Sequence, residues 1–133
     1  MMKKWLALSL LCLALNANAI VDVKTAKTPV QKQHLGKITQ FKGQLKGYQT
    51  VDHRFQVKKG QRLKIRLLSK NRFAYFSLYE PKNDEAIFTG AISGDQFKGV
   101  AKKSGEYRLR TYLVRAAARR NEVAKYRVDI IQN

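Results

Sequence analysis

The 133-residue sequence predicts an all-β protein, a single antiparallel β-sandwich of about seven or eight short strands. The clearest strand is RLKIRLL (residues 62–68), in which basic and apolar residues alternate strictly. A strand that is buried on one face only shows this period of two. Turn signals such as KKG and KKSG recur at short intervals, and after the first twenty residues no long stretch has helical periodicity.

Residues 1–19 have the three parts of a secretory signal peptide. A basic start, MMKK, is followed by an apolar stretch of eleven residues and by the small residues NANA. The apolar stretch is shorter than the ~20 residues that a membrane-spanning helix needs. We therefore expect cleavage after Ala19 and export. Because Cys12 lies in the signal peptide, the exported chain has no cysteine and must be stabilised by packing alone.

The remaining chain divides into a short extended segment and one sandwich domain. Residues 20–36 contain Pro29 and show little periodicity, which favours an extended segment ahead of a domain at residues 37–133. Strands are expected, in order, at residues 53–57, 62–68, 73–79, 86–90, 95–101, 106–114 and 126–131. The inward positions of the last two are Tyr107, Leu109, Thr111, Leu113, Tyr126, Val128 and Ile130.

The connection between the last two strands is unusually long. Twelve residues separate Leu113 from Tyr126, and the segment RAAARRNE within them favours one or two turns of helix. A helix would place Arg115 and Arg119 on one face and let Glu122 pair with either of them. Long ordered loops on a rigid sheet often carry binding residues. The alternative is a solvated basic loop without a task.

The residues give no sign of a catalytic or metal site. His34 and His53 are the only histidines, and His53 directly follows Asp52, so on a strand their side chains would point to opposite faces. No serine lies in a recognisable nucleophile turn, and the two histidines do not form a metal motif. Asp84 and Glu85 fall in a turn. We expect no enzymatic activity, metal or cofactor, although a hydrolase that uses two of the nine acids remains an alternative.

The charge balance predicts an anionic partner. The chain has 27 Lys and Arg against 9 Asp and Glu, a formal net charge of +18. Such a field attracts nucleic acids, anionic envelope surfaces and acidic proteins. The export signal argues against nucleic acid. A competing hypothesis is an envelope-associated module that binds an anionic polymer or lipid through basic strand faces, namely Arg62, Lys64, Arg66, Arg108 and Arg110. Solubility alone is the other explanation of the charge.

Five short segments resemble one family when they are taken together and in order. They are KGY (46–48), VKKGQRLKI (57–65), SGEYRLR (104–110), RAAARRN (115–121) and KYRVDI (125–130). With these segments the chain resembles the periplasmic inhibitors of g-type (goose-type) lysozyme from about Phe41 to the C-terminus. The resemblance implies a periplasmic β-sandwich that protects a bacterium by inserting into the active-site cleft of a host lysozyme. The partner would be g-type lysozyme, and the oligomeric state stays open.

The resemblance also implies which residues contact the lysozyme. The family's contact residues, the tyrosine of KGY and two arginines four positions apart, fall on Tyr48, Arg115 and Arg119. Residues that would support them are Lys46, Gly47, Arg120, Asn121 and Glu122. The family pattern is more polar between the two arginines, whereas this chain has Ala116 and Ala117. That difference leaves the conformation of the loop open.

Arginine and tyrosine suit the implied target. A lysozyme cleft contains carboxylates that perform its chemistry. Guanidinium groups form short, charge-assisted and often bidentate hydrogen bonds with carboxylates. A tyrosine adds a rigid aromatic surface with one polar tip, as interface anchors often do.

Overall fold

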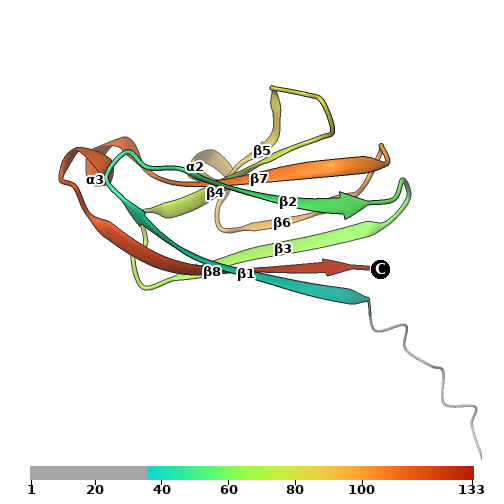
Figure 1. The fold of residues 1–133 in the computed structure, drawn as a ribbon, viewed down its shortest axis with the longest axis horizontal. Helices are drawn as coiled ribbons and strands as arrows, with labels where there is room; N and C mark the ends of the chain where they lie inside the picture. Colours follow the sequence, from blue (N-terminus) through green and yellow to red (C-terminus); the bar gives the residue numbers. More distant parts are fainter. Residues whose placement is uncertain (1–35) are drawn as a thin grey trace, which may run out of the picture. The chain divides into compact units, whose positions relative to one another are not determined.

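Two antiparallel β-sheets pack face to face in the computed structural model, which describes residues 36–133 (Figure 1). The first sheet has the strand order β1 (Lys37–Lys46), β8 (Val123–Gln132), β3 (Arg62–Ser69) and β6 (Gln96–Val100). The second sheet has the order β2 (Val51–Val57), β7 (Gly105–Leu113), β4 (Ala74–Tyr79) and β5 (Ala86–Thr89). The connections contain two short helices, α2 (Gly90–Ser93) and α3 (Arg115–Arg119). The predicted antiparallel β-sandwich with a short helix before the last strand is confirmed.

All the expected strands are present, but their ends differ by up to three residues. β8 begins at Val123 instead of Tyr126, so the connection after Leu113 is residues 114–122 and is shorter than expected. Two other differences concern β1 and β5. β1 was not among the expected strands, because its inward positions include Thr39 and Gly43, which weaken the apolar alternation. The strand expected at residues 86–90 ends at Thr89, since Gly90 already begins α2. The predictions for residues 1–19 and for residues 20–35 lie outside the described residues. Within residues 36–133, no helix is long and apolar enough to cross a membrane.

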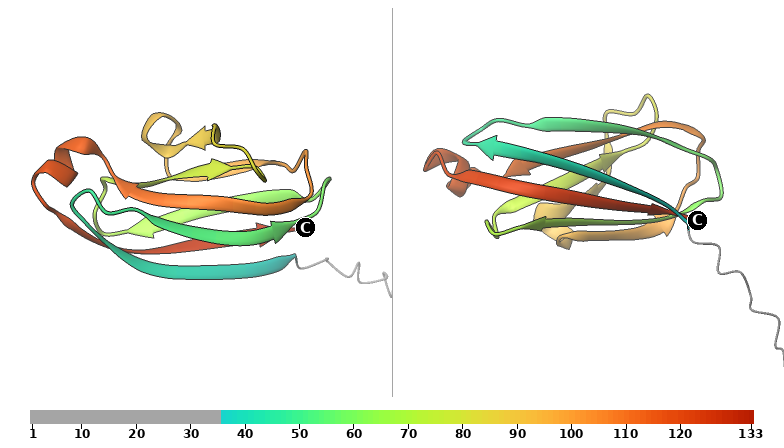
Figure 2. Two further views of the ribbon diagram at one scale, coloured as in Figure 1. Left: turned by 45° about the horizontal axis from the view of Figure 1, so that its top comes forward. Right: turned by 60° about the horizontal axis from the view of Figure 1, so that its bottom comes forward.

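Consecutive strands mostly alternate between the two sheets, so the connections cross from sheet to sheet at the two ends of the sandwich (Figures 1 and 2). The β1–β2 turn, the β3–β4 connection and α3 lie at one end. The β2–β3 and β6–β7 turns lie at the other end, where the Lys59 amide donates to Ser104 Oγ at 2.8 Å. The fold therefore brings three connections that are distant in sequence to one end.

The inward faces of both sheets form one hydrophobic core. The residues predicted to point inward from β3, β7 and β8 are all buried: Leu63, Ile65, Leu67, Tyr107, Leu109, Thr111, Leu113, Tyr126, Val128 and Ile130. Two buried hydroxyl groups of this core have backbone partners, as buried polar groups need. Thr111 Oγ1 donates to the carbonyl of Val51 at 3.3 Å, and the Tyr107 hydroxyl donates to the carbonyl of Lys103 at 2.9 Å.

An aromatic cluster joins β2 to the first sheet at one edge of the sandwich. The His53 ring stacks on Phe41 with a centroid separation of 4.7 Å, and His53 Nε2 lies 2.7 Å from the Tyr126 hydroxyl. Gly43 lies opposite Tyr126 in the β1–β8 register, and a Cβ at Gly43 would lie 2.6 Å from Tyr126 Cζ. The glycine thus leaves room for the tyrosine ring. Burial lowers the pKa of His53 and raises the pKa of Tyr126, so the hydrogen bond joins two neutral side chains.

The outer face of the second sheet is basic in sequence but largely neutralised in the structure. Arg110 forms a bidentate pair with Asp52, at 2.7 and 3.1 Å. Arg54 pairs with Glu106 at 3.2 Å, and Arg108 lies 3.7 Å from a carboxylate oxygen of Asp84. The guanidinium groups of Arg108 and Arg110 also lie 4.3 and 5.8 Å from the centre of the Tyr79 ring.

The outer face of the first sheet differs, because it carries many cations and one carboxylate. We call this surface the basic face. Its lysines and arginines, all exposed, are Lys42, Lys46, Arg62, Lys64, Arg66, Lys98, Lys125 and Arg127. Asp129 is the carboxylate on its strands, and it pairs with Arg127 at 2.9 and 3.1 Å. The predicted basic strand faces therefore lie on opposite sides of the sandwich, and they differ in charge.

Candidate functional site

Three connections support one another at the α3 end of the sandwich. The Gly47 amide in the β1–β2 turn donates to the carbonyl of Glu122 at 3.0 Å. The Val114 amide, just before α3, donates to the carbonyl of Phe73 in the β3–β4 connection at 3.0 Å. Asn71, also in the β3–β4 connection, donates from Nδ2 to Glu122 Oε1 at 3.1 Å. Backbone and side-chain bonds thus fix α3 on the sandwich from two sides.

The alanines of α3 allow it to pack closely against this end. Ala117 and Ala118 are 0% and 3% exposed, whereas Arg115, Ala116 and Arg119 are exposed. At about 100° per residue, Arg115 and Arg119 lie on the same flank of the helix. The predicted helix and its i, i+4 arginine pair are confirmed. Ala117, one of the alanines between Arg115 and Arg119, is therefore a packing residue.

The end of α3 has the geometry of a Schellman motif. Asn121 adopts the left-handed conformation with φ of 55°, its amide donates to the carbonyl of Ala118 at 2.9 Å, and the Glu122 amide donates to the carbonyl of Ala117 at 3.1 Å. Gly47 packs directly on this cap, since a Cβ there would lie 2.7 Å from Asn121 Oδ1. Gly47 itself has φ of +59°, which favours glycine.

The expected pairing of Glu122 with Arg115 or Arg119 is wrong. Glu122 Oε2 accepts from Arg120 Nε at 2.7 Å, and the same Arg120 guanidinium lies 5.6 Å from the centre of the Phe73 ring. The reason is that Glu122 follows the left-handed Asn121 and so no longer continues the helix. Arg120 is thus a bracing residue. Within residues 36–133, neither Arg115 nor Arg119 forms an ion pair or a side-chain hydrogen bond.

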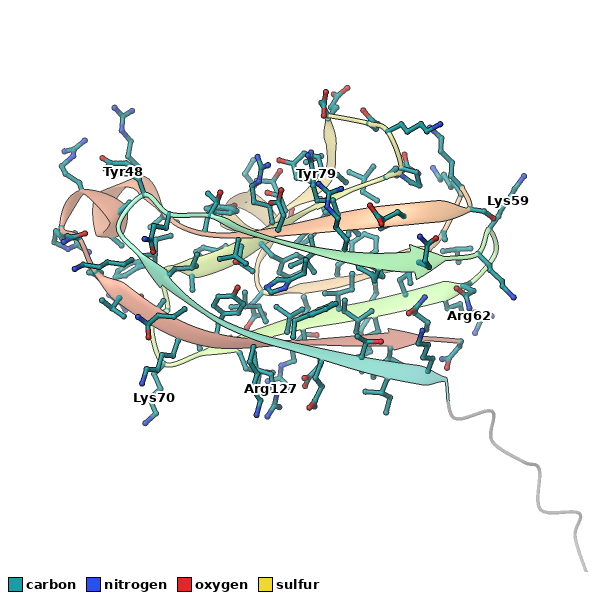
Figure 3. All side chains as sticks on the ribbon, viewed as in Figure 1. Tyr48, Lys59, Arg62, Lys70, Tyr79 and Arg127 are labelled. Carbon is teal, nitrogen blue, oxygen red and sulfur yellow. The ribbon has the colours of Figure 1, made fainter. Side chains whose placement is uncertain are left out.

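Tyr48 lies beside α3 and projects from the β1–β2 turn (Figure 3). Its side chain is 67% exposed, although tyrosines at other positions of this chain pack into the core or against arginines. The turn is held by the Gln49 amide, which donates to the carbonyl of Lys46 at 3.1 Å, and by the Lys46 amide, which donates to Gln49 Oε1 at 3.2 Å. Lys46 itself lies at the edge of the basic face.

Sequence reasoning missed two residues that position this site. Asn71 bonds to Glu122, and Phe73 lies under Arg120 and also 5.0 Å from the Arg72 guanidinium. No local motif marks them as part of this site, because the residues they support, Glu122 and Arg120, lie about fifty positions away. The described part of the chain contains no group of His, Cys, Asp or Glu that could hold a metal ion.

The fold and this site together define a class: a β-sandwich that presents, from a braced end, an exposed tyrosine and two arginines that form no ion pair with the described residues, as protein-binding modules do. The chain matches no family model. It is 29% identical over 126 residues to the inhibitor of g-type lysozyme from Escherichia coli (strain K12), a match that covers 91% of this chain and 90% of that protein.

Solved structures of such inhibitors share the fold. PliG from Aeromonas hydrophila, a periplasmic inhibitor of g-type lysozyme, superposes with a TM-score of 0.67 at 26% identity over 78% of this chain and 93% of that chain. PliG from Salmonella Typhimurium superposes with a TM-score of 0.56 at 26% identity, over 72% of this chain and 91% of that chain. A PliG mutant from Escherichia coli superposes with a TM-score of 0.55 at 29% identity, over 78% of this chain and 95% of that chain. The resemblance to periplasmic inhibitors of g-type lysozyme is therefore confirmed.

Proposed function

We propose that the protein is a periplasmic, non-enzymatic inhibitor of g-type lysozyme, and that Tyr48, Arg115 and Arg119 insert into the acidic active-site cleft of the lysozyme. The inhibitor role is supported by the similarity in sequence and fold to PliG proteins. The site rests on one observation: the guanidinium groups of Arg115 and Arg119 form no ion pair within residues 36–133, and they lie with an exposed tyrosine at one braced end.

The state of the two arginines suits the capture of carboxylates. Because neither forms an ion pair with another residue of the range 36–133, no ion pair in that part of the chain must break before binding. A lysozyme carboxylate would accept charge-assisted hydrogen bonds from the guanidinium groups in a site from which water is largely excluded. Such pairs are strong when they are desolvated and weak when they stay at the rim. Arg115 and Arg119 should therefore contribute strongly to binding only when the cleft of the lysozyme shields them from water.

The surroundings of α3 lower the cost of ordering the site. The helix is fixed by the buried Ala117 and Ala118, by the Schellman cap and by the bonds of Glu122 to Arg120 and Asn71. A loop that is already in its bound conformation loses less entropy on association. Arg120, Asn121 and Glu122 thus act by positioning, and Gly47 lets the Tyr48 turn approach the cap.

Substitution of the arginines tests the site. Arg115→Ala and Arg119→Ala should each weaken inhibition of a g-type lysozyme by at least ~30-fold, because truncating one partner of a buried charge pair costs about 2–5 kcal/mol. Tyr48→Ala should weaken it as well. The control is Arg54→Ala, which removes the same charge from the second sheet's outer face. Inhibition constants from a cell-wall lysis assay give the comparison.

Two results would contradict different parts of the proposal. If both arginine variants inhibit as well as the wild type while circular dichroism shows an intact fold, the site is elsewhere. If the wild-type protein inhibits no g-type lysozyme when g-type, c-type and i-type enzymes are assayed side by side, the inhibitor role itself is wrong. Turnover of peptidoglycan by the purified protein would instead indicate a hydrolase.

A further inference from the structure

The two outer faces of the sandwich differ in how their cations are compensated. On the second sheet, Arg54, Arg108 and Arg110 each lie within 4 Å of a carboxylate oxygen, from Glu106, Asp84 and Asp52 respectively. On the basic face, among the described residues, Arg127 is the cation that forms an ion pair. The seven other cations of that face therefore project a field that the fold does not neutralise.

The strand register places like charges directly opposite each other at two pairs of the basic face, while Arg66 lies opposite Asp129. Lys64 of β3 lies opposite Lys98 of β6, and Lys42 of β1 lies opposite Arg127 of β8. Like charges at paired positions are destabilising. Figure 3 shows Arg127 and Lys70 projecting on the side of the sandwich away from Tyr79. The cations thus spread over all four strands of the sheet and do not form a single row.

The same face also carries exposed apolar side chains and a groove. Ile38 is 61%, Val100 59% and Val123 48% exposed. An open groove of about 810 Å³ is lined in part by Arg66, Lys70, Lys125 and Arg127, together with the carboxylate of Asp95. A layer of lysine and arginine with interspersed apolar groups matches the interface of an anionic bilayer, where cations meet phosphates and apolar groups meet the acyl boundary.

We propose that the basic face is a second binding surface, which docks the protein on a bilayer rich in anionic phospholipid. A single polyanion strand would contact only one row of these cations, whereas a headgroup layer can contact cations on several strands at once. The surface lies on the side of the first sheet, while α3 and Tyr48 lie at the end of the sandwich (Figures 1 and 3). Binding to a bilayer therefore leaves the α3 end free, and this surface does not depend on the proposed inhibitor site.

Charge reversal separates this surface from a general effect of net charge. The test variant is Lys42→Glu/Lys64→Glu/Lys98→Glu, which changes one exposed lysine on each of β1, β3 and β6. The matched control is Lys59→Glu/Lys102→Glu/Lys103→Glu, with the same change in charge at exposed turns of the far end. Co-sedimentation is measured with vesicles of phosphatidylglycerol and phosphatidylcholine and with pure phosphatidylcholine vesicles.

The wild type should bind the anionic vesicles, not the neutral ones, and binding should weaken steeply as salt rises. Each basic contact is worth about fivefold, so the test variant should lose at least ~100-fold in partitioning and the control far less. Lys42→Gln/Lys64→Gln/Lys98→Gln should show an intermediate loss if the reversed variant fails to fold. An equal loss in test and control variants would overturn the proposal. Full competition by millimolar glycerol phosphate, or stronger binding to soluble polyphosphate through the same residues, would also overturn it.

Discussion

Three arginines lie within six positions of the α3 segment, and their surroundings give them different roles. Arg120 pairs with Glu122 and covers Phe73, so it stabilises the cap. Arg115 and Arg119 are exposed and form no ion pair within residues 36–133. The sequence predicts the i, i+4 spacing of that pair, but it cannot show which arginine Glu122 selects. That choice depends on the left-handed conformation of Asn121, because Glu122 follows it and no longer continues the helix.

His53 predicts how stability depends on pH. Burial lowers its pKa below the ordinary value of 6.5, although the charge of neighbouring Asp52 opposes this shift. The unfolded chain therefore binds a proton at a higher pH than the folded protein does. The contribution of neutral His53 to the free energy of unfolding should be fully present above about pH 6.5. It should be lost as pH drops from there toward the lower pKa of the folded state. Protonated His53 has two donor nitrogens, so Nε2 would only donate to the Tyr126 hydroxyl, which lies 2.7 Å away.

Urea unfolding at pH 7.5 and 5.5 checks this expectation. The wild type should lose stability between the two values, and His53→Gln, which has no titrating group at that position, should lose less. Both proteins contain His34, so a difference between them in how the free energy of unfolding changes with pH is due to His53. Parallel slopes for both proteins would show that His53 does not carry the pH dependence.

At the scale of elements, the α3 cap should control the inhibitor site. Asn121→Ala keeps a Cβ but lacks the side chain that makes asparagine tolerant of a left-handed backbone, so it should cost about 1 kcal/mol of stability. Asn121→Gly accepts this conformation and serves as the matched variant. If the cap positions Arg115 and Arg119, Asn121→Ala should weaken lysozyme inhibition several-fold and Asn121→Gly much less. Identical inhibition constants for the two variants would argue against positioning by the cap.

Elements differ in how far the sequence reveals them. β3 and β7 were predictable, because a strict period of two reports burial on one face. β1 was not, since its inward Gly43 is small in order to seat the ring of Tyr126 from β8. A glycine of this kind weakens the strand pattern for a reason that lies more than eighty positions away. The roles of Asn71 and Phe73 were not predictable for the same reason, because Glu122 and Arg120 are also distant in sequence.

At the scale of the whole molecule, the sequence predicts the net charge but not its distribution. Arg62, Lys64 and Arg66 have the same alternation as Arg108 and Arg110, so pattern alone treats both strands alike. The tertiary fold distinguishes them. Strand pairing and a nearby loop bring Asp52 and Asp84 to the second sheet's outer face, whereas Asp129 is the one carboxylate on the strands of the basic face. The imbalance is a property of the topology.

An uncompensated face should cost stability, and this cost is measurable. Lys98→Glu places a carboxylate opposite Lys64 in the β3–β6 register, which replaces a repulsive pair with an attractive one. The variant should gain from a few tenths of a kcal/mol to about 1 kcal/mol in unfolding free energy at low salt, and the gain should shrink near 0.5 M NaCl because the charges are exposed. Urea titrations at both salt concentrations measure this effect.

The same Lys98→Glu variant should bind anionic vesicles less tightly than the wild type. A substitution that improves folding and impairs binding is the pattern expected where stability has been exchanged for function. Lys102→Glu, at an exposed turn residue off the paired strands, provides the comparison, because it changes net charge equally without relieving the cross-strand repulsion. If Lys98→Glu and Lys102→Glu gain the same stability, the repulsion is spread over the whole molecule. The pair of Lys64 and Lys98 would then destabilise the fold no more than other cations of the molecule do.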